Sequence, residues 1–514
     1  MQNPTQIWEW LKVHIKRNCR LAFMAAFVVG VLTHAPIMLS DIPNHDGLDS
    51  LYFDQNMITS GRWFLTIACG FSSYFTLPWL IGLLGLSMLA LAAAVLVDFL
   101  EVQKSWAVVL ISAMLAAFPV LASTFAYVFT LDGYMMAFLF AILAVWCVKK
   151  WKKGFIAGGF FLAFSMGIYQ SYLSLAVVLS IYGILIIFMT ESTVKEKLLA
   201  GVKYLYMGIV GVAGYYIILQ LLLKIQGKEL AAYQGIDGMG AGLGSGILDT
   251  VKSMYRDFFG FTLKGNVLVN NGFSMVAMVV LVLLTLFVLL GVAVTRKWMK
   301  SPWFYMILLL LAVGIPVATN IIFVVSPNVT YHLLMRYQWV LFPICMVAFV
   351  CRYVPEKFRN MSEWLLLLSS LVLAFNFVVT DQIAYSNLEK KYEKTYAYCL
   401  RLLDRIEQTE GYYPGIPIAM IGVVGDEQFP VTNLTEHVTS GMIGMTGDYL
   451  LYTGNNYRLF MQSYLGATLN ILPSEAMAEM YYHEEYVAMD SFPGENSVKI
   501  IDGIMYIKTE NENR

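Results

Sequence analysis

The chain has 514 residues, of which 58% are hydrophobic and only 13% charged, and its formal net charge is −1. Soluble domains carry about 25% charged residues, so a single soluble domain is excluded, as is nucleic-acid binding through an overall basic surface. The small net charge is the sum of two parts of opposite charge. Residues 1–380 hold 25 Lys/Arg and 16 Asp/Glu, whereas residues 381–514 hold 9 Lys/Arg and 19 Asp/Glu. We predict a membrane domain at 1–380, followed by an acidic domain at 381–514.

The first 380 residues contain eleven apolar runs, which predict an α-helical polytopic membrane protein. Runs of roughly 17–25 apolar residues are long enough to cross a bilayer as helices. The tenth run is short and could be tilted, and the boundary between the fifth and the sixth is weak. The eleven predicted spans cover approximately residues 21–39, 77–97, 106–124, 131–148, 154–170, 172–190, 204–223, 273–295, 302–325, 338–351 and 364–380.

The distribution of Lys and Arg predicts which ends of these helices face the cytoplasm. The N-terminus and the segments that alternate with it hold 18 Lys/Arg, whereas the opposite segments before residue 381 hold 7, of which 5 lie in the loop 224–272. Cytoplasmic segments carry the excess of positive charge. We therefore expect a cytoplasmic N-terminus and, after eleven spans, an extracytoplasmic C-terminal domain.

The C-terminal domain reads as a small α/β fold. Asp502–Gly503 is a favoured turn pair between alternating apolar residues and predicts a β-hairpin over 498–508. Further predicted elements are a helix at 383–410, a buried strand at 417–424, and helices at 455–469 and 474–482. The six cysteines predict no disulfide framework. In the membrane domain, the glycine-rich centre of the loop 224–272 indicates a segment that orders on a ligand.

Ionisable and aromatic residues gather at the predicted outer edge of the membrane, where charges are costly unless they serve a function. The first outer loop, 40–64, holds His45, Arg62, Trp63 and four acids: Asp41, Asp46, Asp49 and Asp54. Asp132 lies in the very short second outer loop. The later outer turns contribute Tyr169, Gln170, Tyr331, His332, Arg336 and Tyr337. No metal-ligand spacing and no nucleotide-binding glycine motif accompanies them.

This set of residues suits the transfer of a sugar. A carboxylate can act as general base for a sugar hydroxyl, an arginine can hold a departing phosphate, and aromatic side chains offer flat surfaces to sugar rings. Single residues also have simpler interpretations. A lone outer Asp is more often solvated, Asp132 could cap the following helix, and Arg336 could reach the lipid head groups.

Four short motifs carry a family resemblance. They are 44–48 (NHDGL) with 60–64 (SGRWF), 129–135 (FTLDGYM), 167–172 (GIYQSY) and the ending 492–503 (FPGENSVKIIDG). The first three are similar to loop signatures of the bacterial glucosyltransferase family typified by the serotype-converting GtrII proteins, and the ending resembles that of its Gram-positive-type members. The resemblance extends over nearly the whole chain.

The resemblance implies a GT-C fold in a bacterial cytoplasmic membrane, with the active site at the outer face. It also implies a polyprenyl-phosphate sugar donor, commonly glucose, and a polysaccharide or glycolipid acceptor. Asp46 matches the catalytic acid of the first loop, and Asp49 stays an alternative because no acid directly follows Asp46. Asp132 looks like the second acidic position, and Arg336 is similar to the arginine that binds the donor phosphate.

We therefore predict an inverting membrane glycosyltransferase. Asp46 would deprotonate the acceptor, Asp132 would position a sugar or share a divalent cation with Asp46, and Arg336 with Arg62 would stabilise the leaving phosphate. No resident cofactor is predicted, and divalent-cation use stays open. The other predicted substrate-binding residues are His45, His332, Tyr337, Tyr169, Gln170 and Trp63.

Three other functions fit the topology. A transporter or flippase of lipid-linked sugars would show inverted repeats and charges near the middle of the bilayer. A polysaccharide polymerase or ligase would use a diphosphate-linked donor and more outer arginines. A sensor would bind a ligand with its outer domain and would not need Asp46 and Asp132.

Overall fold

A computed structural model gives the fold of the chain. It describes residues 3–50, 57–70, 72, 76–190, 193–239, 246–264, 267–300, 302–326, 328–422, 436–439, 441–445 and 450–509. The chain divides into two compact units. The first comprises Met1–Leu39 and Asp54–Gln382, and the second comprises Ser40–Phe53 and Ile383–Arg514. Residues 40–53 of the predicted membrane domain therefore cluster with the C-terminal unit.

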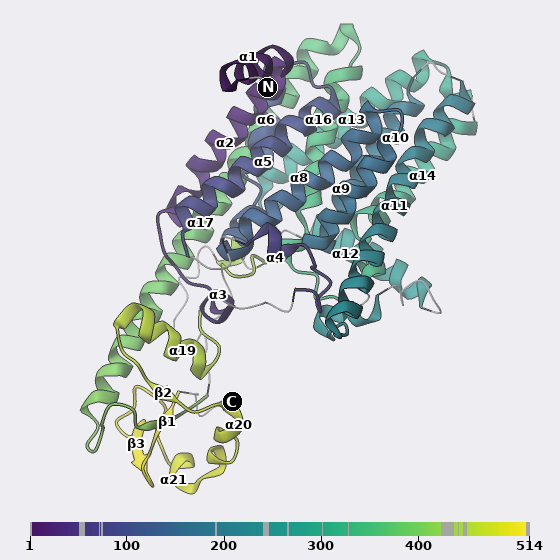
Figure 1. Cartoon of the computed structure of the whole chain (residues 1–514). Helices are drawn as coiled ribbons and strands as arrows, with labels where there is room; N and C mark the ends of the chain where they lie inside the picture. Colours follow the sequence, from purple (N-terminus) through teal and green to yellow (C-terminus); the bar gives the residue numbers. More distant parts are fainter. Residues whose placement is uncertain are drawn as a thin grey trace. The chain divides into compact units, whose positions relative to one another are not determined.

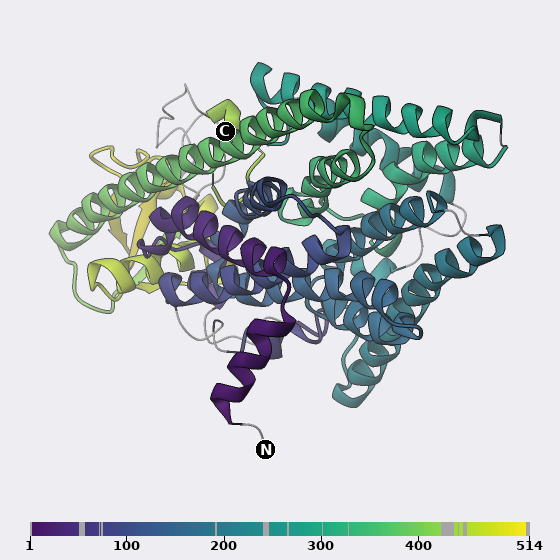
Figure 2. The same cartoon turned by 90° about the horizontal axis from the view of Figure 1, so that it is seen from above.

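The first unit is built from long helices that run side by side (Figure 1). Within it α8 packs against both α5 and α9, α2 packs on α5, and α11 packs on α9; Figure 2 shows the same bundle from above. Its helices are α1 (Pro4–His14), α2 (Arg17–Met38), α4 (Leu65–Ala68), α5 (Pro78–Leu100), α6 (Ser105–Ala116), α7 (Val120–Phe125), α8 (Val128–Lys150), α9 (Gly154–Ile168), α10 (Leu173–Phe188), α11 (Val194–Gln226), α12 (Ile247–Leu263), α13 (Gly272–Thr295), α14 (Pro302–Thr319), α15 (Ile322–Val325), α16 (Leu341–Tyr353) and the first part of α17 (Arg359–Gln408). Short 3₁₀ turns complete it, among them η2 (Gln170–Tyr172), η6 (Leu333–Met335) and η7 (Tyr337–Val340).

Nine of the eleven predicted spans overlap one helix each, whereas 106–124 is divided between α6 and α7 and 302–325 between α14 and α15. Among the described residues, seven helical segments are long and apolar enough to cross a membrane: Arg17–Met38, Pro78–Leu100, Val128–Lys150, Gln170–Phe188, Val194–Gln226, Gly272–Thr295 and Glu356–Gln408. The other four predicted spans overlap shorter apolar helical segments: Ser105–Ala116, Gly154–Ile168, Phe304–Thr319 and Tyr337–Tyr353. Length and composition thus support seven of the eleven spans.

Ion pairs join the predicted inner segments at one end of the first unit. Asp98, near the end of α5, pairs with Lys16 at 2.6 Å and Lys150 at 2.7 Å and accepts a hydrogen bond from the Trp146 indole. Further pairs join Glu101 to Lys149 and Arg352, and Lys104 to Glu363. We call this the basic end, defined by Lys16, Lys149, Lys150 and Arg352. Segments that are far apart in sequence therefore meet at the same end, as the distribution of Lys and Arg predicts.

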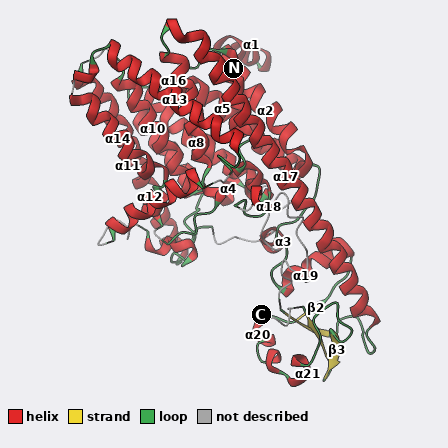
Figure 3. Ribbon diagram, turned by 180° about the vertical axis from the view of Figure 1, so that it is seen from behind, coloured by secondary structure: helices red, strands yellow, loops and turns green. Residues whose placement is uncertain are grey.

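The second unit contains a small sheet, which Figure 3 shows in yellow. Its strand order is β2 (Asn470–Ile471), β1 (Pro417–Ile421), β4 (Ile504–Lys508) and β3 (Val498–Ile501). β1 pairs in parallel with β2 and β4, and β3 pairs antiparallel with β4. Asp502 and Gly503 have φ of 49° and 79°, as a type I′ turn requires, so the predicted hairpin is confirmed.

The predicted helix at 383–410 is the continuation of α17, which runs unbroken from Arg359 to Gln408. In the second unit its apolar face, with Tyr398, Leu402 and Ile406, packs in one cluster with residues of β1 and β4. The predicted strand 417–424 is shorter and ends at Ile421, and residues 423–435 lie outside the described part. The other helices of this unit are α3 (His45–Ser50), α18 (Glu436–Thr439), α19 (Gly454–Phe460), α20 (Ser474–Met477) and α21 (Glu484–Val487).

Replacing Asp98 tests the ion cluster at the basic end. We expect Asp98→Asn to lower the midpoint of thermal unfolding in detergent by roughly 3 °C or more, because Lys16 and Lys150 lose their shared counter-charge. Scanning fluorimetry measures the midpoint. Asp249→Asn, which removes a fully solvated pair with Lys252, should leave it unchanged. Equal midpoints for Asp98→Asn and the unaltered protein would contradict the role of the cluster.

Candidate functional site

The segment 57–64 packs against the first unit at the end opposite the basic end. Gln170 Nε2 donates a hydrogen bond to the Ser60 carbonyl at 2.9 Å, and the Tyr215 hydroxyl donates to the Gly61 carbonyl at 3.0 Å. Gly61 has φ +76°, and a Cβ there would lie 2.5 Å from Gln170 Nε2. Only glycine fits this position. Gln170, predicted to bind substrate, therefore holds the first outer loop in place.

Arg62 follows directly and lies against two stacked tyrosines. Its Nη1 is 3.4 Å from the Tyr134 hydroxyl, and its guanidinium carbon is 5.2 Å from the centre of the Tyr169 ring. The rings of Tyr134 and Tyr169 stack at 4.5 Å. Tyr134 comes from α8 and Tyr169 from the junction of α9 and η2, so three separate segments build this group.

Trp63 is buried beside Arg62 and acts through packing. Its ring contacts Phe164 of α9 edge-on at 5.5 Å, and a Cβ at Gly167 would lie 2.7 Å from it. The Phe64 amide donates to the Gly167 carbonyl at 2.7 Å. With 8% of its surface exposed, Trp63 fixes the loop on α9 and offers little surface to a sugar.

Arg336 lies in a cage of aromatic rings and is paired with an acid. Both terminal nitrogens of its guanidinium donate to the Asp257 carboxylate at 2.7 Å. The guanidinium also stacks on Tyr331 at 3.9 Å and on Phe261 at 4.4 Å. Asp257 and Phe261 belong to α12, so this helix of the loop 224–272 covers the arginine. Arg336 is a buried, bidentate partner of Asp257 rather than a head-group anchor.

His332 connects the two arginines electrostatically. It is partly buried, and within the described residues its buried Nδ1 has no hydrogen-bond partner. Burial, together with the positive charges of Arg62 and Arg336, lowers the pKa of His332 to about 4. The imidazole is therefore neutral near pH 7. His332 therefore lies within electrostatic range of both arginines, and we call the cluster of Arg62, His332 and Arg336 the arginine pocket. The Asp257 carboxylate balances the charge of Arg336 in this cluster.

Asp132 is held inside α8. Its Oδ1 accepts hydrogen bonds from the Ser72 hydroxyl at 2.7 Å and from the Gly133 amide at 2.9 Å. The residue that caps α8 is Tyr127, five positions earlier, so the interpretation of Asp132 as the helix cap is wrong. Asp132 lies on the same turn of α8 as Tyr134, the tyrosine that Arg62 contacts.

Tyr337 points into the helix bundle. Its hydroxyl donates to the Leu115 carbonyl at 2.8 Å, and its ring packs edge-on against Phe118 and Phe138. The side chain has no exposed surface. Tyr337, predicted to bind substrate, therefore stabilises the packing of η7 on α6 and α8.

Asp46 and His45 belong to the second unit, on the short helix α3. His45 Nε2 lies 3.2 Å from Asp46 Oδ1, and the Asp46 side chain is 54% exposed. The His45 ring contacts Tyr452 at 4.2 Å. Asp49 lies on the same helix, but its side chain falls outside the described part, as does Asp54 entirely. Asp46 is thus an accessible carboxylate with a histidine neighbour.

The structure adds residues that the sequence did not single out. Asp257 pairs with Arg336, Tyr134 meets Arg62, and Tyr215 holds Gly61. Asp381 is fully buried in the first unit, and within the described residues neither of its carboxylate oxygens has a hydrogen-bond partner. Its only sequence signal is its place directly after the last apolar run. Burying a carboxylate without a hydrogen-bond partner costs free energy. Asp381 is therefore a candidate for a polar contact with a ligand.

Nothing in the described part of the chain groups three His, Cys, Asp or Glu side chains as metal ligands. The polar groups nearest to the two arginines are aromatic hydroxyls, a histidine and the Asp257 carboxylate. This donor set fits an anion between the cations better than it fits a divalent metal ion.

Gly61→Ala tests the docking of the first loop. The added Cβ collides with Gln170 and Tyr215 and the alanine must adopt a positive φ, so we expect a loss of roughly 2 kcal/mol or more of stability. Thermal unfolding measures the loss. Gly208→Ala on α11, where a Cβ meets no atom within 4 Å, should be neutral or slightly stabilising. A Gly61→Ala protein as stable as Gly208→Ala would refute the docking.

The pKa of His332 predicts a pH dependence of stability. Between pH 6.5 and 4 the unfolded chain binds a proton at this residue and the folded chain does not, so stability falls with falling pH by up to about 3 kcal/mol. The fall ends below about pH 4. In His332→Gln this contribution is absent, so unfolding midpoints across this range should change less than in the unaltered protein. His483→Gln, in the second unit, should keep the full pH dependence; equal slopes in all three proteins would contradict the assignment.

Comparison with known proteins gives one family. A family model described as "Glucosyl transferase GtrII" matches residues 35–353, more than half of the chain. No curated protein and no solved structure matches. The matched segment contains Asp46, Arg62, Asp132, His332 and Arg336. The chain belongs to the GtrII glucosyl transferase family.

Proposed function

We propose that this protein transfers a sugar, most simply glucose, from a polyprenyl-phosphate donor to a cell-surface polysaccharide or glycolipid at the outer face of the bacterial cytoplasmic membrane. Membership of a glucosyl transferase family supports the chemistry. The observation that carries the proposal is the cluster of Arg62, His332 and Arg336 at the end of apolar helices. An anionic lipid phosphate is a ligand that such a pocket can recognise from within the membrane.

In this proposal Arg62 makes the main contact with the donor phosphate. Arg336 already gives two hydrogen bonds to the Asp257 carboxylate, which balances its charge, so its contribution to phosphate binding is secondary. The phosphate gains negative charge as the bond to the sugar breaks, and fixed cations stabilise that charge without rearranging. The stacked Tyr134 and Tyr169 are buried beside Arg62 and hold its guanidinium in place.

Asp46 acts as the general base. It takes the proton from the acceptor hydroxyl, whose oxygen forms a bond to the anomeric carbon as the bond from that carbon to the phosphate oxygen breaks. The electron pair of the broken bond stays on the phosphate. Attack from the face opposite the phosphate inverts the anomeric configuration. The exposed carboxylate of Asp46 supports this role, because an acceptor can reach it, whereas Asp132 is buried and suits positioning.

The topology proposed with this function places the basic end in the cytoplasm and the arginine pocket at the outer face. The N-terminus is then cytoplasmic and the second unit is extracytoplasmic, where a polysaccharide or glycolipid acceptor is available. The segment 40–53 supports an acceptor role for the second unit, because it brings Asp46 into that unit.

Asp46→Asn tests the base directly. With purified protein and a synthetic polyprenyl-phosphate glucose, we expect the rate of sugar transfer to fall by roughly 10²–10⁴-fold, while binding of the donor is retained. The measurement follows the glycosylated product and the released polyprenyl phosphate. Asp502→Asn keeps a turn residue that tolerates positive φ, and should transfer at the normal rate.

Two outcomes would decide against this assignment. Full activity of Asp46→Asn, with loss of activity in Asp49→Asn, would move the base to Asp49. Movement of the labelled lipid across the membrane without any glycosylated product would favour a flippase instead.

A further inference from the structure

A second feature of the first unit lies away from the arginine pocket. An apolar cavity of about 320 Å³ opens between α10, α13, α14 and α16, and its walls include Tyr182, Leu286, Ala312 and Phe349. Apart from the hydroxyl groups of Tyr182 and Thr285 and the thiol of Cys345, its lining side chains are hydrocarbon or thioether. Gln170–Phe188, which includes α10, and α13 are both long and apolar enough to cross a membrane, so the apolar lining of the cavity suits a hydrocarbon chain.

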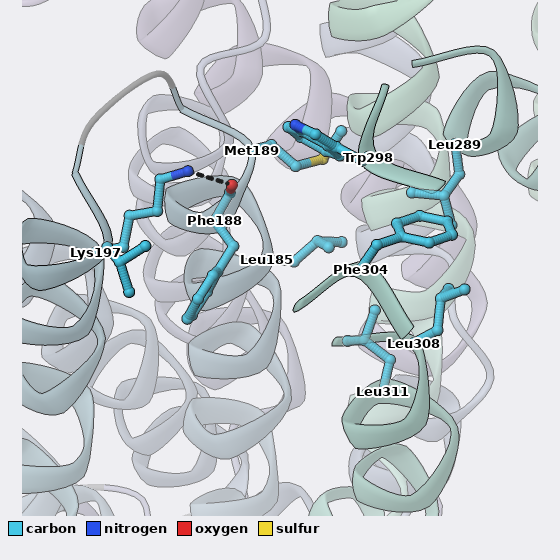
Figure 4. A pocket seen from close by; sticks show the side chains of 10 residues that line it. Leu185, Phe188, Met189, Lys197, Leu289, Trp298, Phe304, Leu308 and Leu311 are labelled. Carbon is cyan, nitrogen blue, oxygen red and sulfur yellow. Dashed lines mark hydrogen bonds between the residues drawn. The ribbon is translucent and has the colours of Figure 1, made fainter. Parts of the chain in front are cut away.

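The cavity continues into a smaller one with a polar rim. The second cavity, of about 160 Å³, shares four leucines with the first: Leu185, Leu289, Leu308 and Leu311. Figure 4 shows Lys197 and Phe188 on the left, Leu185 in the centre and Trp298 above it. Phe304 lies on the right together with the other three leucines. The two cavities therefore adjoin at these leucines, and we call them together the leucine groove after those four residues.

The rim of the leucine groove is positively charged. Lys197 Nζ donates a hydrogen bond to the Phe188 carbonyl at 3.0 Å, and Arg296 donates to the Met189 carbonyl. Arg296 also lies over the Trp298 ring at 5.3 Å. No ion pair joins Lys197 or Arg296 to an acid within the described residues. An indole and two cations at the end of an apolar groove are typical of the membrane interface.

The rim is too far from Arg62 for its ligand to be the sugar donor whose phosphate Arg62 would hold. α8, α9 and α10 alternate in direction through short turns, so the C-terminal end of α10 lies at the basic end. The arginine pocket lies at the opposite end, beside η2 at the start of α10. A helix of 16 residues is about 24 Å long, so a phosphate at Lys197 is too far away to be the phosphate held by Arg62.

We propose that the leucine groove binds an anionic phospholipid of the leaflet opposite the sugar-transfer site. One acyl chain lies along the four leucines, and the phosphate lies between Lys197 and Arg296. The lysine ammonium carries three N–H donors, so it can contact a phosphate while it keeps its bond to Phe188. Charge complementarity selects an anionic head group over a zwitterionic one.

This lipid would connect to the arginine pocket through α14. The groove runs along one side of α14, and the other end of this helix reaches the pocket: Gln338 donates to the Thr319 carbonyl at 2.8 Å. The next residue, Asn320, donates to the Met254 carbonyl of α12 at 2.7 Å, and Met254 precedes Asp257 by three positions. A lipid that fixes α14 against α10 therefore also steadies the helix that pairs with Arg336.

Native mass spectrometry of the full chain tests the proposal. Delipidated protein is titrated with phosphatidylglycerol or phosphatidylcholine of identical acyl chains. We expect one phosphatidylglycerol to bind more tightly than phosphatidylcholine. Lys197→Gln should weaken phosphatidylglycerol binding about fivefold and leave phosphatidylcholine binding unchanged. Leu308→Trp, which narrows the groove, should weaken both.

A matched control and competing occupants make the result decisive. Lys252→Gln removes an exposed lysine on α12 and should change neither affinity. Equal binding of both phospholipids, or unchanged binding in both groove variants, would overturn the proposal. Displacement of phosphatidylglycerol by an equal amount of polyprenyl phosphate would assign the groove to the donor instead. Because the readout is lipid binding, its outcome is independent of whether Asp46→Asn abolishes sugar transfer.

Discussion

The absence of water in the bilayer core is the constraint on which the first unit depends. Backbone groups there can bond only to each other, so the apolar segments form helices, and charged groups collect where the helices end. The basic end shows this directly, because Asp98 and Glu101 gather four cations from segments far apart in the sequence. At the opposite end the same constraint makes Arg336 bind Asp257 with both of its terminal nitrogens.

The positions of Arg62 and Arg336 depend on how two connecting segments pack on these helix ends. The first loop is fixed by Gln170 and Tyr215, and this places Arg62 against Tyr134 and Tyr169. The turn η6 is fixed by Ser171, whose hydroxyl donates to the Met335 carbonyl at 2.8 Å. Together these contacts bring Arg62 and Arg336 within electrostatic range of His332. The residues that bind the loops therefore matter as much for the pocket as the two cations.

The two units offer different functional groups to their proposed ligands. The first unit offers cations, aromatic rings and apolar grooves, which suit lipids that carry a phosphate. The second unit contains a small sheet and offers an exposed carboxylate, Asp46, which suits the hydroxyl group of a polysaccharide or glycolipid acceptor. The continuous helix α17 contributes residues to both, and the leucine groove adds a lipid contact at the basic end.

The sequence alone determined the helices, the clustering of cations at one end and the hairpin at Asp502–Gly503, because hydropathy, charge and turn preference are properties of neighbouring residues. It also singled out Arg62, His332 and Arg336 by residue type. Only the tertiary structure decided that Asp257 pairs with Arg336, that Gln170 and Tyr337 serve packing, and that residues 40–53 cluster with the C-terminal unit. These outcomes depend on contacts between segments separated by tens to hundreds of positions, which local patterns do not encode.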